Sequence, residues 1–339
     1  MQAAQPGAPT PAVPPARPVV VIGNFDGVHH GHRALLEHAR SLLPGHPLVV
    51  VTFEPHTMAV VRPDVVVPRL TTAACKLELL RVAGADEVVV LPFDRETAGW
   101  SPTEFVDRVL RPLHPAVVAV GDGFRFGHRA KGDISTLTEA GERDPADRFD
   151  VAALPLVDVS VRGRRTAVSS TAIRYALEAG DVEGAAEMLG RDHQVSGVVV
   201  RGDQRGRALL GYPTANLPAD EDALVPADGV YAGWLSGDLR GPHDPPGNGP
   251  VRLPAAISVG SNPTFDGVQR RVESYVLDRD DLELYGVGVT VDFAARIRGQ
   301  VKFDSIEELV TQMGDDVDRA HDLLGVPGPA PDSPADTTR

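Results

Sequence analysis

The stretch Gly23-Asn-Phe-Asp-Gly-Val-His-His-Gly-His32 decides the fold of the first half of this chain. It follows a short β-branched run, Val19–Ile22, and leads into residues 33–42, where apolar side chains recur at helical spacing. A strand, a glycine-rich loop and a helix in this order aim backbone N–H groups and the positive end of the helix dipole at an anion. His29 and His32 add side-chain donors where phosphate charge would develop in a transition state.

This stretch also has two simpler interpretations. A glycine-rich loop alone is usually only a turn, and a lone histidine is usually solvated or already hydrogen-bonded. Two histidines three residues apart are also compatible with a metal site. Zinc sites, however, recruit further Cys, His or carboxylate ligands at recognisable spacings, and Cys75 is the only cysteine of the chain. We therefore favour phosphate binding over metal binding.

Composition narrows the class of protein. With 339 residues the chain is long enough for two domains, each with its own core. Its net charge of −14 argues against a nucleic-acid partner, and no apolar run reaches the length needed to span a membrane. A single cysteine fits a reducing, cytoplasmic location. Residues 1–18 are predicted to be a disordered leader, and residues 326–339 a disordered tail.

The two halves of the chain differ in their pattern of predicted strands and helices. β-branched runs alternate with helical patterns up to about residue 186, which predicts a parallel sheet covered by helices. The predicted strands are 19–22, 48–53, 87–91 and 117–120, and the predicted helices are 33–42, 72–83 and 102–111. A helical stretch, 170–189, is expected to link this half to the next. Regularly spaced short strands follow, at 194–200, 229–235, 255–259, 272–277 and 287–294, which predict a β-barrel or sandwich with a final helix at 305–324.

A second phosphate-binding signal is Val168-Ser-Ser-Thr-Ala-Ile-Arg174. Hydroxyls at this position cap a helix N-terminus, which alone explains them, but Arg174 adds a cation suited to a polyphosphate. Together with His-x-Gly-His, the motif resembles the nucleotidyltransferase superfamily, whose members transfer a nucleoside monophosphate from a triphosphate. The resemblance implies that His29 and His32 are catalytic. It implies that ATP is bound by Gly23, Phe25, Gly31, Ser169, Ser170, Thr171 and Arg174.

Two segments at predicted strand ends narrow the resemblance. Residues 52–56, Thr-Phe-Glu-Pro-His, and 120–128, Val-Gly-Asp-Gly-Phe-Arg-Phe-Gly-His, lie where ligands bind in open α/β sheets. Both resemble the FMN adenylyltransferase module of bacterial bifunctional riboflavin kinase/FAD synthetase. Phe53, Phe124 and Phe126 are predicted to contact the flavin ring, although aromatic residues at strand ends are more often part of the core. The chain departs from the family at Gly123, where Asn or Asp is common.

The second half carries a separate signature. Residues 211–217 read Gly-Tyr-Pro-Thr-Ala-Asn-Leu and resemble the Pro-Thr-Ala-Asn motif of the riboflavin kinase family. Thr214 and Asn216 offer a hydroxyl and a carbonyl oxygen, which are hard ligands suited to Mg²⁺ carrying ATP. Gly206 and Arg207, in the preceding glycine- and arginine-rich segment, are assigned to ATP binding by the same resemblance. A P-loop pattern is absent from the sequence.

Glu273 is the catalytic base that this resemblance implies. It lies in Val272-Glu-Ser-Tyr-Val-Leu-Asp278, whose alternation also permits a merely solvated glutamate on a strand. The chemistry favours a base, because a ribityl hydroxyl is a poor nucleophile until a carboxylate accepts its proton. Tyr275 stands where many relatives have His and is given no role.

We therefore predict a two-domain α/β plus β enzyme. A Rossmann-like nucleotidyltransferase domain, 19–188, precedes a riboflavin kinase β-barrel with a terminal helix, 189–325. Riboflavin would be phosphorylated to FMN and FMN adenylylated to FAD, each step using one ATP and Mg²⁺. The expected partners are riboflavin, FMN, FAD and ATP, without nucleic acid or membrane. Two alternatives remain: only the kinase module is active, or the protein is a non-catalytic flavin carrier.

Overall fold

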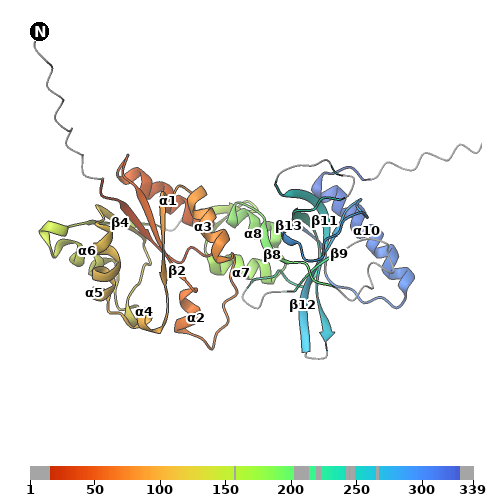
Figure 1. Ribbon diagram of the computed structural model, residues 1–339, viewed down its shortest axis with the longest axis horizontal. Coiled ribbons are helices and arrows are strands. Elements are labelled where there is room, and N and C mark those ends of the chain that lie inside the picture. The colour runs from red at the N-terminus through yellow and green to blue at the C-terminus, as the bar shows by residue number, and fades with distance from the viewer. Residues whose placement is uncertain are drawn as a thin grey trace, which may run out of the picture. The chain divides into compact units, whose positions relative to one another are not determined.

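The computed structural model describes residues 16–155, 158–201, 214–218, 223–241, 244, 249–264 and 267–328 (Figure 1). Contacts within the chain define two compact units. Unit 1 comprises Met1–Asn24, Ala34–Val60 and Leu80–Pro155; unit 2 comprises Phe25–Arg33, Val61–Leu79 and Leu156–Arg339. Most of the predicted leader and tail, together with Gly206 and Arg207, lie outside the described residues.

Unit 1 contains a five-stranded parallel sheet in the order β3-β2-β1-β4-β5. The strands are β1 (Val19–Ile22), β2 (Leu48–Glu54), β3 (Glu87–Pro92), β4 (Val117–Gly121) and β5 (Asp150–Leu154). Every residue of β1 is buried, as the unbroken β-branched run predicts for a central parallel strand. The predicted Rossmann-like sheet is confirmed, and β5 is a strand that the sequence pattern did not identify.

Helices connect these strands. They are α1 (His30–Leu42), α2 (Thr57–Val61), α3 (Ala73–Val82), α4 (Arg95–Gly99), α5 (Pro102–Phe105), η1 (Val106–Leu110), η2 (Arg111–Leu113), η3 (His128–Ala130), α6 (Ile134–Glu142) and η4 (Pro145–Asp147). Helix α1 begins three residues before the predicted start, so the second and third histidines of the loop lie in its first turn. Ser101 and Glu104 form a capping box at α5.

Unit 2 contains a curled antiparallel sheet of six strands in the order β8-β13-β10-β11-β12-β9. The strands are β8 (His193–Val198), β9 (Thr214–Pro218), β10 (Gly229–Gly237), β11 (Val251–Thr264), β12 (Gly267–Val276) and β13 (Gly288–Arg298). An antiparallel bridge between Val200 and Asn216, with a 2.9 Å hydrogen bond, joins the two ends of the sheet. The predicted barrel is confirmed. A separate hairpin pairs β6 (Asp158–Val161) with β7 (Arg164–Ala167).

The predicted helical stretch at 170–189 consists of two helices with a short break between them. Helix α7 (Ser170–Glu178) ends before Gly180, whose φ of 77° is left-handed. Asp181 then caps α8 (Val182–Leu189) by accepting a hydrogen bond from the Gly184 N–H. The apolar spacing continues across this break, which is why the sequence pattern did not reveal it.

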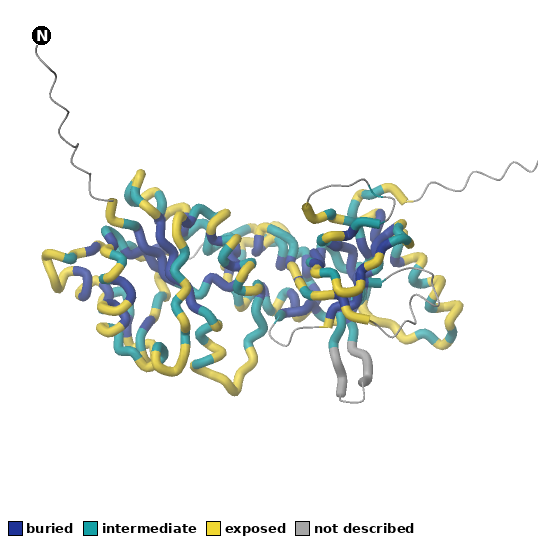
Figure 2. Tube along the Cα trace, viewed as in Figure 1, coloured by how far each residue is buried: buried dark blue, intermediate teal, exposed yellow. Residues whose placement is uncertain are grey.

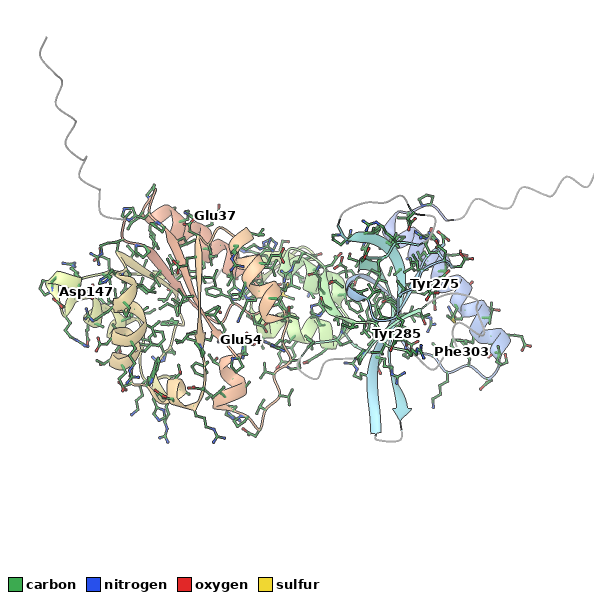
Figure 3. The ribbon with its side chains drawn as sticks, in the orientation of Figure 1. Glu37, Glu54, Asp147, Tyr275, Tyr285 and Phe303 are labelled. Carbon is green, nitrogen blue, oxygen red and sulfur yellow. The ribbon has the colours of Figure 1, made fainter. Side chains whose placement is uncertain are left out.

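Each unit has its own buried centre (Figure 2). In unit 2 one apolar cluster joins the inner face of the sheet to α7 and α8; it includes Ile173, Leu189, Tyr231 and Phe293. The last helix, α10 (Ile306–Leu324), packs against β10, β11 and β13 on the other face, where Tyr275 lies in a smaller apolar cluster (Figure 3). The sheet therefore presents an inner apolar face and an outer face that α10 covers only in part.

Candidate active sites

The His-x-Gly-His loop has a strained backbone. Phe25, Gly27 and Val28 have φ values of 52°, 84° and 38°. Glycine adopts such angles without strain, but a β-branched residue does so rarely. Phe25 and Val28 are nevertheless buried, so their packing holds the loop in this shape. Strain of this kind concentrates at functional sites, where surrounding contacts maintain it.

Two helix N-termini meet at this loop. Helix α1 begins at His30, and Ser170, the first residue of α7, donates a 2.9 Å hydrogen bond from Oγ to the Asp26 carbonyl. A Cβ atom at Gly31 would lie 3.6 Å from the Val168 carbonyl oxygen and 3.2 Å from the His29 ring. A side chain at this position would therefore push on His29. The positive ends of two helix dipoles in one place form a suitable site for an anion.

His29 and His32 form a stacked pair at the start of α1. Their ring centroids are 3.6 Å apart, and the edge of Phe25 meets His32 at 5.1 Å. Burial and the positive charges of Arg191, Arg33 and His30 lower the pKa of His29 from 6.5 to about 4. Burial, followed by the charge of His29, also lowers the pKa of His32. Both rings are thus neutral at pH 7 and can donate an N–H to phosphate without carrying a charge.

Asp26 is a loop residue to which the sequence assigned no role. Its buried carboxylate accepts hydrogen bonds from the Leu70 N–H at 3.0 and 3.2 Å and forms an ion pair with Arg174. Arg174 also donates to the Pro68 carbonyl at 2.8 Å. The guanidinium predicted to meet ATP thus binds a carboxylate of the loop itself. Its assignment to ATP stays a prediction, as do those of Ser169, which caps α7, and the exposed Thr171.

The three phenylalanines predicted to contact flavin lie together in unit 1. Phe53 and Phe126 are buried and pack on Phe105, with centroids 6.4 and 5.5 Å away, while half-buried Phe124 stacks on Phe126 at 5.5 Å. Phe53 and Phe126 thus belong to the core of the unit. Phe124 has the most exposed ring surface of the three, and flavin contact stays a prediction for all of them.

The predicted kinase residues gather on the outer face of the sheet in unit 2. In the antiparallel ladder Glu273 of β12 lies directly opposite Asn216 of β9 on one side and Ser258 of β11 on the other. Opposite residues of an antiparallel pair point to the same face. Thr214, two residues before Asn216, shares that face, and its Oγ1 accepts a 3.1 Å hydrogen bond from Asn216 Nδ2. Glu273 and Asn216, 57 positions apart in the sequence, are thus brought side by side.

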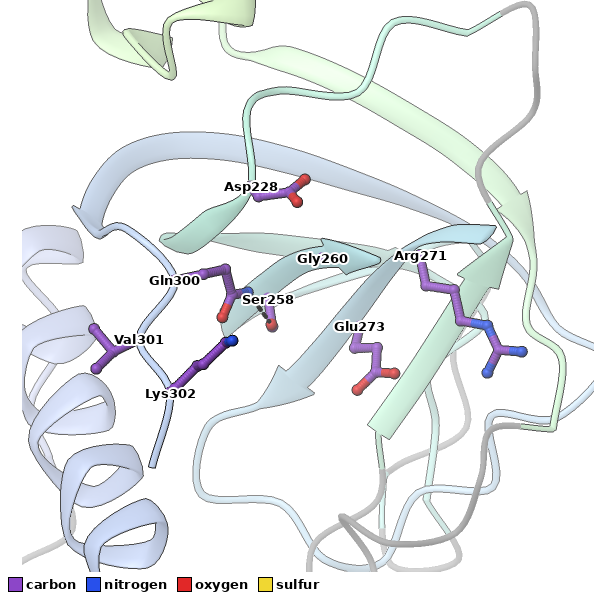
Figure 4. Close-up of a pocket in the computed structure, with 8 residues that line it drawn as sticks. All are labelled: Asp228, Ser258, Gly260, Arg271, Glu273, Gln300, Val301 and Lys302. Carbon is purple, nitrogen blue, oxygen red and sulfur yellow. Dashed lines mark hydrogen bonds between the residues drawn. The ribbon is translucent and has the colours of Figure 1, made fainter. Parts of the chain in front are cut away.

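A cavity of about 460 Å³ opens beside Glu273 (Figure 4). Gln300 spans one wall by donating to Ser258 Oγ at 3.3 Å and to the Val259 carbonyl at 2.9 Å. Two cations, Arg271 and Lys302, line the same cavity as the carboxylate. The complete lining is Asp228, Ser258, Gly260, Arg271, Glu273, Gln300, Val301 and Lys302. A carboxylate with nearby cations in a concave site can accept a proton next to a polyphosphate.

The donors on this face suit a hard cation. Thr214 supplies a hydroxyl oxygen, and the hydrogen bond from Asn216 Nδ2 to Thr214 fixes the plane of an amide whose other atom is a carbonyl oxygen. Magnesium bound with ATP takes few protein ligands besides phosphate and water. The described residues contain no group of three or more His, Cys, Asp or Glu side chains placed to hold a metal ion.

Comparison with known proteins agrees with both halves of this geometry. The family model for FAD synthetase matches residues 14–172, and the model for riboflavin kinase matches residues 189–324. The bifunctional riboflavin kinase/FMN adenylyltransferase of Escherichia coli K12 is 35% identical over 92% of this chain and 94% of its own. That of Listeria monocytogenes is 33% identical over 88% and 90%. The chain belongs to this bifunctional family.

A solved structure is similar to this chain in its fold as well as in its sequence. A protein described as a macrolide-efflux protein from Streptococcus pneumoniae aligns with a TM-score of 0.75 at 30% identity, over 91% of this chain and 95% of its own. Its description names a different activity from that of the bifunctional relatives. In the part of this chain that the structure describes, no helix is both long and apolar enough to cross a membrane.

Several residues near these sites cannot be identified from sequence motifs alone. Asp228 and Ser258 lie in the range that the riboflavin kinase model matches, but only the fold places them at the cavity. Lys302 belongs to no motif of the sequence, and only the cavity shows that it lies near Glu273. Asp26 offers no signal either, since one Asp in a loop does not reveal a partner 148 residues away.

Proposed function

We infer that this chain phosphorylates riboflavin to FMN and adenylylates FMN to FAD, using ATP in both steps, and that Glu273 and the His29–His32 pair carry the chemistry. The register that sets Glu273 opposite Asn216, with Thr214 on the same face, supports the kinase assignment most directly. This register places a proton acceptor beside oxygen ligands that suit a nucleotide-bound cation. The absence of a membrane-spanning helix in the described residues is compatible with a cytoplasmic location.

In the kinase step the 5′-hydroxyl oxygen of riboflavin attacks the γ-phosphorus of ATP. Glu273 accepts the hydroxyl proton. The bond between the γ-phosphorus and the bridging oxygen of ADP breaks, and ADP leaves. Lys302 and Arg271, which line the same cavity, are placed to offset the charge of the phosphates. When bound, Mg²⁺ supplies further neutralisation of that charge, and Thr214 and Asn216 are the residues that would hold it.

In the adenylyl step an oxygen of the FMN phosphate attacks the α-phosphorus of ATP, and pyrophosphate leaves. That phosphate is already ionised near neutral pH, so the step needs positioning and charge stabilisation rather than a base. The meeting of two helix N-termini at the loop supports this role. Neutral His29 and His32 donate N–H groups to phosphate oxygens whose charge grows as the bond to pyrophosphate breaks.

One assay tests both activities. The purified chain is incubated with riboflavin, ATP and Mg²⁺, and the flavins are separated by chromatography. We expect FMN to appear first and FAD later. FMN without FAD, together with no conversion of supplied FMN, would show that only the kinase module is active. Binding of flavin without any product would identify a carrier instead.

A further inference from the structure

The end of α8 approaches the His-x-Gly-His loop closely. The helix ends at Leu189, and Gly190 follows with a left-handed φ of 68°, its N–H donating to the Ala186 carbonyl at 2.6 Å. A Cβ atom at Gly190 would meet the ends of the Arg33 and His30 side chains. The left-handed backbone angle favours glycine here, and the turn sends the next residue, Arg191, back toward the loop.

Two arginine–carbonyl hydrogen bonds join the loop to this turn. Arg191 Nη2 donates to the Gly27 carbonyl at 2.7 Å, and Arg33 Nη2 donates in the opposite direction to the Leu189 carbonyl. The Leu189 side chain also packs on the loop, 3.3 Å from where a Cβ of Gly27 would lie. Residues 189–191 therefore hold the strained part of the loop in place. These residues belong to the range that the riboflavin kinase model matches.

The charge of Arg191 is only partly compensated. Its Nη1 atom is buried and has no hydrogen-bond partner among the described residues. Asp26 is the carboxylate among the groups whose charges affect the pKa of Arg191, and it is already bound to Arg174. A buried donor without a partner is unfavourable, so such a group normally binds water, an ion or a ligand. Arg191 also lies near enough to His29 to lower its pKa, second only to burial.

We propose that Arg191 is a positioning residue for adenylyl transfer: it fixes the His-x-Gly-His loop through Gly27 and directs positive charge toward the triphosphate of ATP. This inference rests on the adenylyl-transfer function proposed above. It means that the adenylyl site is completed by a residue outside the range 14–172 that the FAD synthetase model matches. A chain truncated after the matched range would lack this support.

The test uses the full-length chain and the variants Arg191→Gln, Arg191→Lys and, as a matched control, Arg165→Gln at an exposed arginine of β7. Both activities are measured on each protein. In Arg191→Gln we expect kcat for FAD formation from FMN to fall about 10- to 100-fold, with a smaller change in KM for ATP, because misplaced groups mainly slow the chemical step. Arg191→Lys keeps the charge but not the fork of the guanidinium, so it should recover part of the loss. Arg165→Gln should behave as wild type.

Riboflavin phosphorylation by the same molecules serves as the control for folding. Unchanged kinase activity with lost FAD formation supports the proposal. FAD formation within about twofold of wild type in Arg191→Gln would overturn it, and so would equal loss of both activities, which would make Arg191 a general structural residue. If the wild-type chain makes no FAD from FMN, the proposed adenylyl function itself is wrong, and that result is distinct from any effect of the variants.

Discussion

Glu273, Thr214 and Asn216 lie on one face of the curled sheet in unit 2, because the register of β9 and β12 sets Glu273 opposite Asn216. Their motifs identify the three residues, but only this register shows that they share a face. Conversely, Asp26 and Lys302 have no motif of their own and become visible only through an ion pair and a cavity. A motif can identify a candidate site residue. Which distant residues that side chain contacts depends on the completed fold.

Glu273→Gln should lose FMN formation and keep FAD formation from supplied FMN. Glutamine preserves the shape of the side chain but cannot accept the hydroxyl proton, and removal of such a base lowers kcat by about 10²- to 10⁴-fold. The two reactions are measured separately by flavin chromatography. The matched control is His32→Ala, which should show the opposite pattern because His32 belongs to the other site. A Glu273→Gln enzyme that phosphorylates riboflavin at the wild-type rate would make this glutamate a solvated strand residue.

At the scale of elements, the hydrophobic pattern predicts the strands and helices whose apolar residues recur at a regular local spacing. All four predicted parallel strands and the final helix occur near their expected bounds, because a buried strand and an amphipathic helix each have a clear period. The break between α7 and α8 was missed, since Gly180 and Asp181 interrupt the backbone without interrupting the apolar spacing. Strand order and register were also out of reach, because they are set by packing between distant segments.

The link between the loop and α7 should be measurable as a coupled pair. Asp26 and Arg174 are both largely buried, with side chains 6% and 12% exposed, so removing one partner leaves an uncompensated charge. We expect Asp26→Asn and Arg174→Met each to lower the free energy of unfolding by about 3 kcal/mol. The double variant should lose clearly less than the sum. Urea denaturation of the four proteins checks this. Additive losses would show that the two side chains stabilise the fold independently.

At the scale of the whole molecule, buried neutral histidines make stability depend on pH. Burial lowers the pKa of His193 from 6.5 to about 4, although the hydrogen bond of its ring to the Leu224 carbonyl opposes this shift. Burial likewise lowers the pKa of His29 to about 4. Between pH 6.5 and pH 4 the unfolded chain therefore binds more protons than the folded one, so stability falls as the pH falls.

The expected loss for His193 alone is about 3 kcal/mol between pH 7 and pH 4. The free energy of unfolding of wild type, His193→Gln and the exposed-site control His38→Gln is measured across this range. His193→Gln should show a flatter pH dependence than the other two proteins, even if it is less stable at pH 7. Parallel curves for all three would mean that His193 is not held neutral in the fold.

The kinase half should need α7 and α8 to be fully stable. Ile173, Leu177 and Val182 belong to the same apolar cluster as the inner face of the sheet, and the Ala227 N–H donates to the Leu177 carbonyl at 2.9 Å. Arg296 of β13 donates to the Ala179 carbonyl at 3.0 Å, in the turn between the two helices. The predicted domain boundary at residue 189 would cut these contacts, while a boundary before β6 would keep them.

We therefore expect a fragment of residues 158–339 to unfold at a clearly higher temperature than one of residues 189–339. Each fully buried aliphatic side chain contributes about 1.5–3 kcal/mol, so losing two helices removes several kcal/mol from the smaller fragment. Both fragments retain Glu273, Thr214 and Asn216, so both should phosphorylate riboflavin at low temperature, and the shorter one should lose this activity first on warming. Thermal unfolding followed by circular dichroism, with the kinase assay at each temperature, measures the difference. Equal midpoints would show that the sheet and α10 fold without these helices, and the boundary at residue 189 would then describe a physical domain.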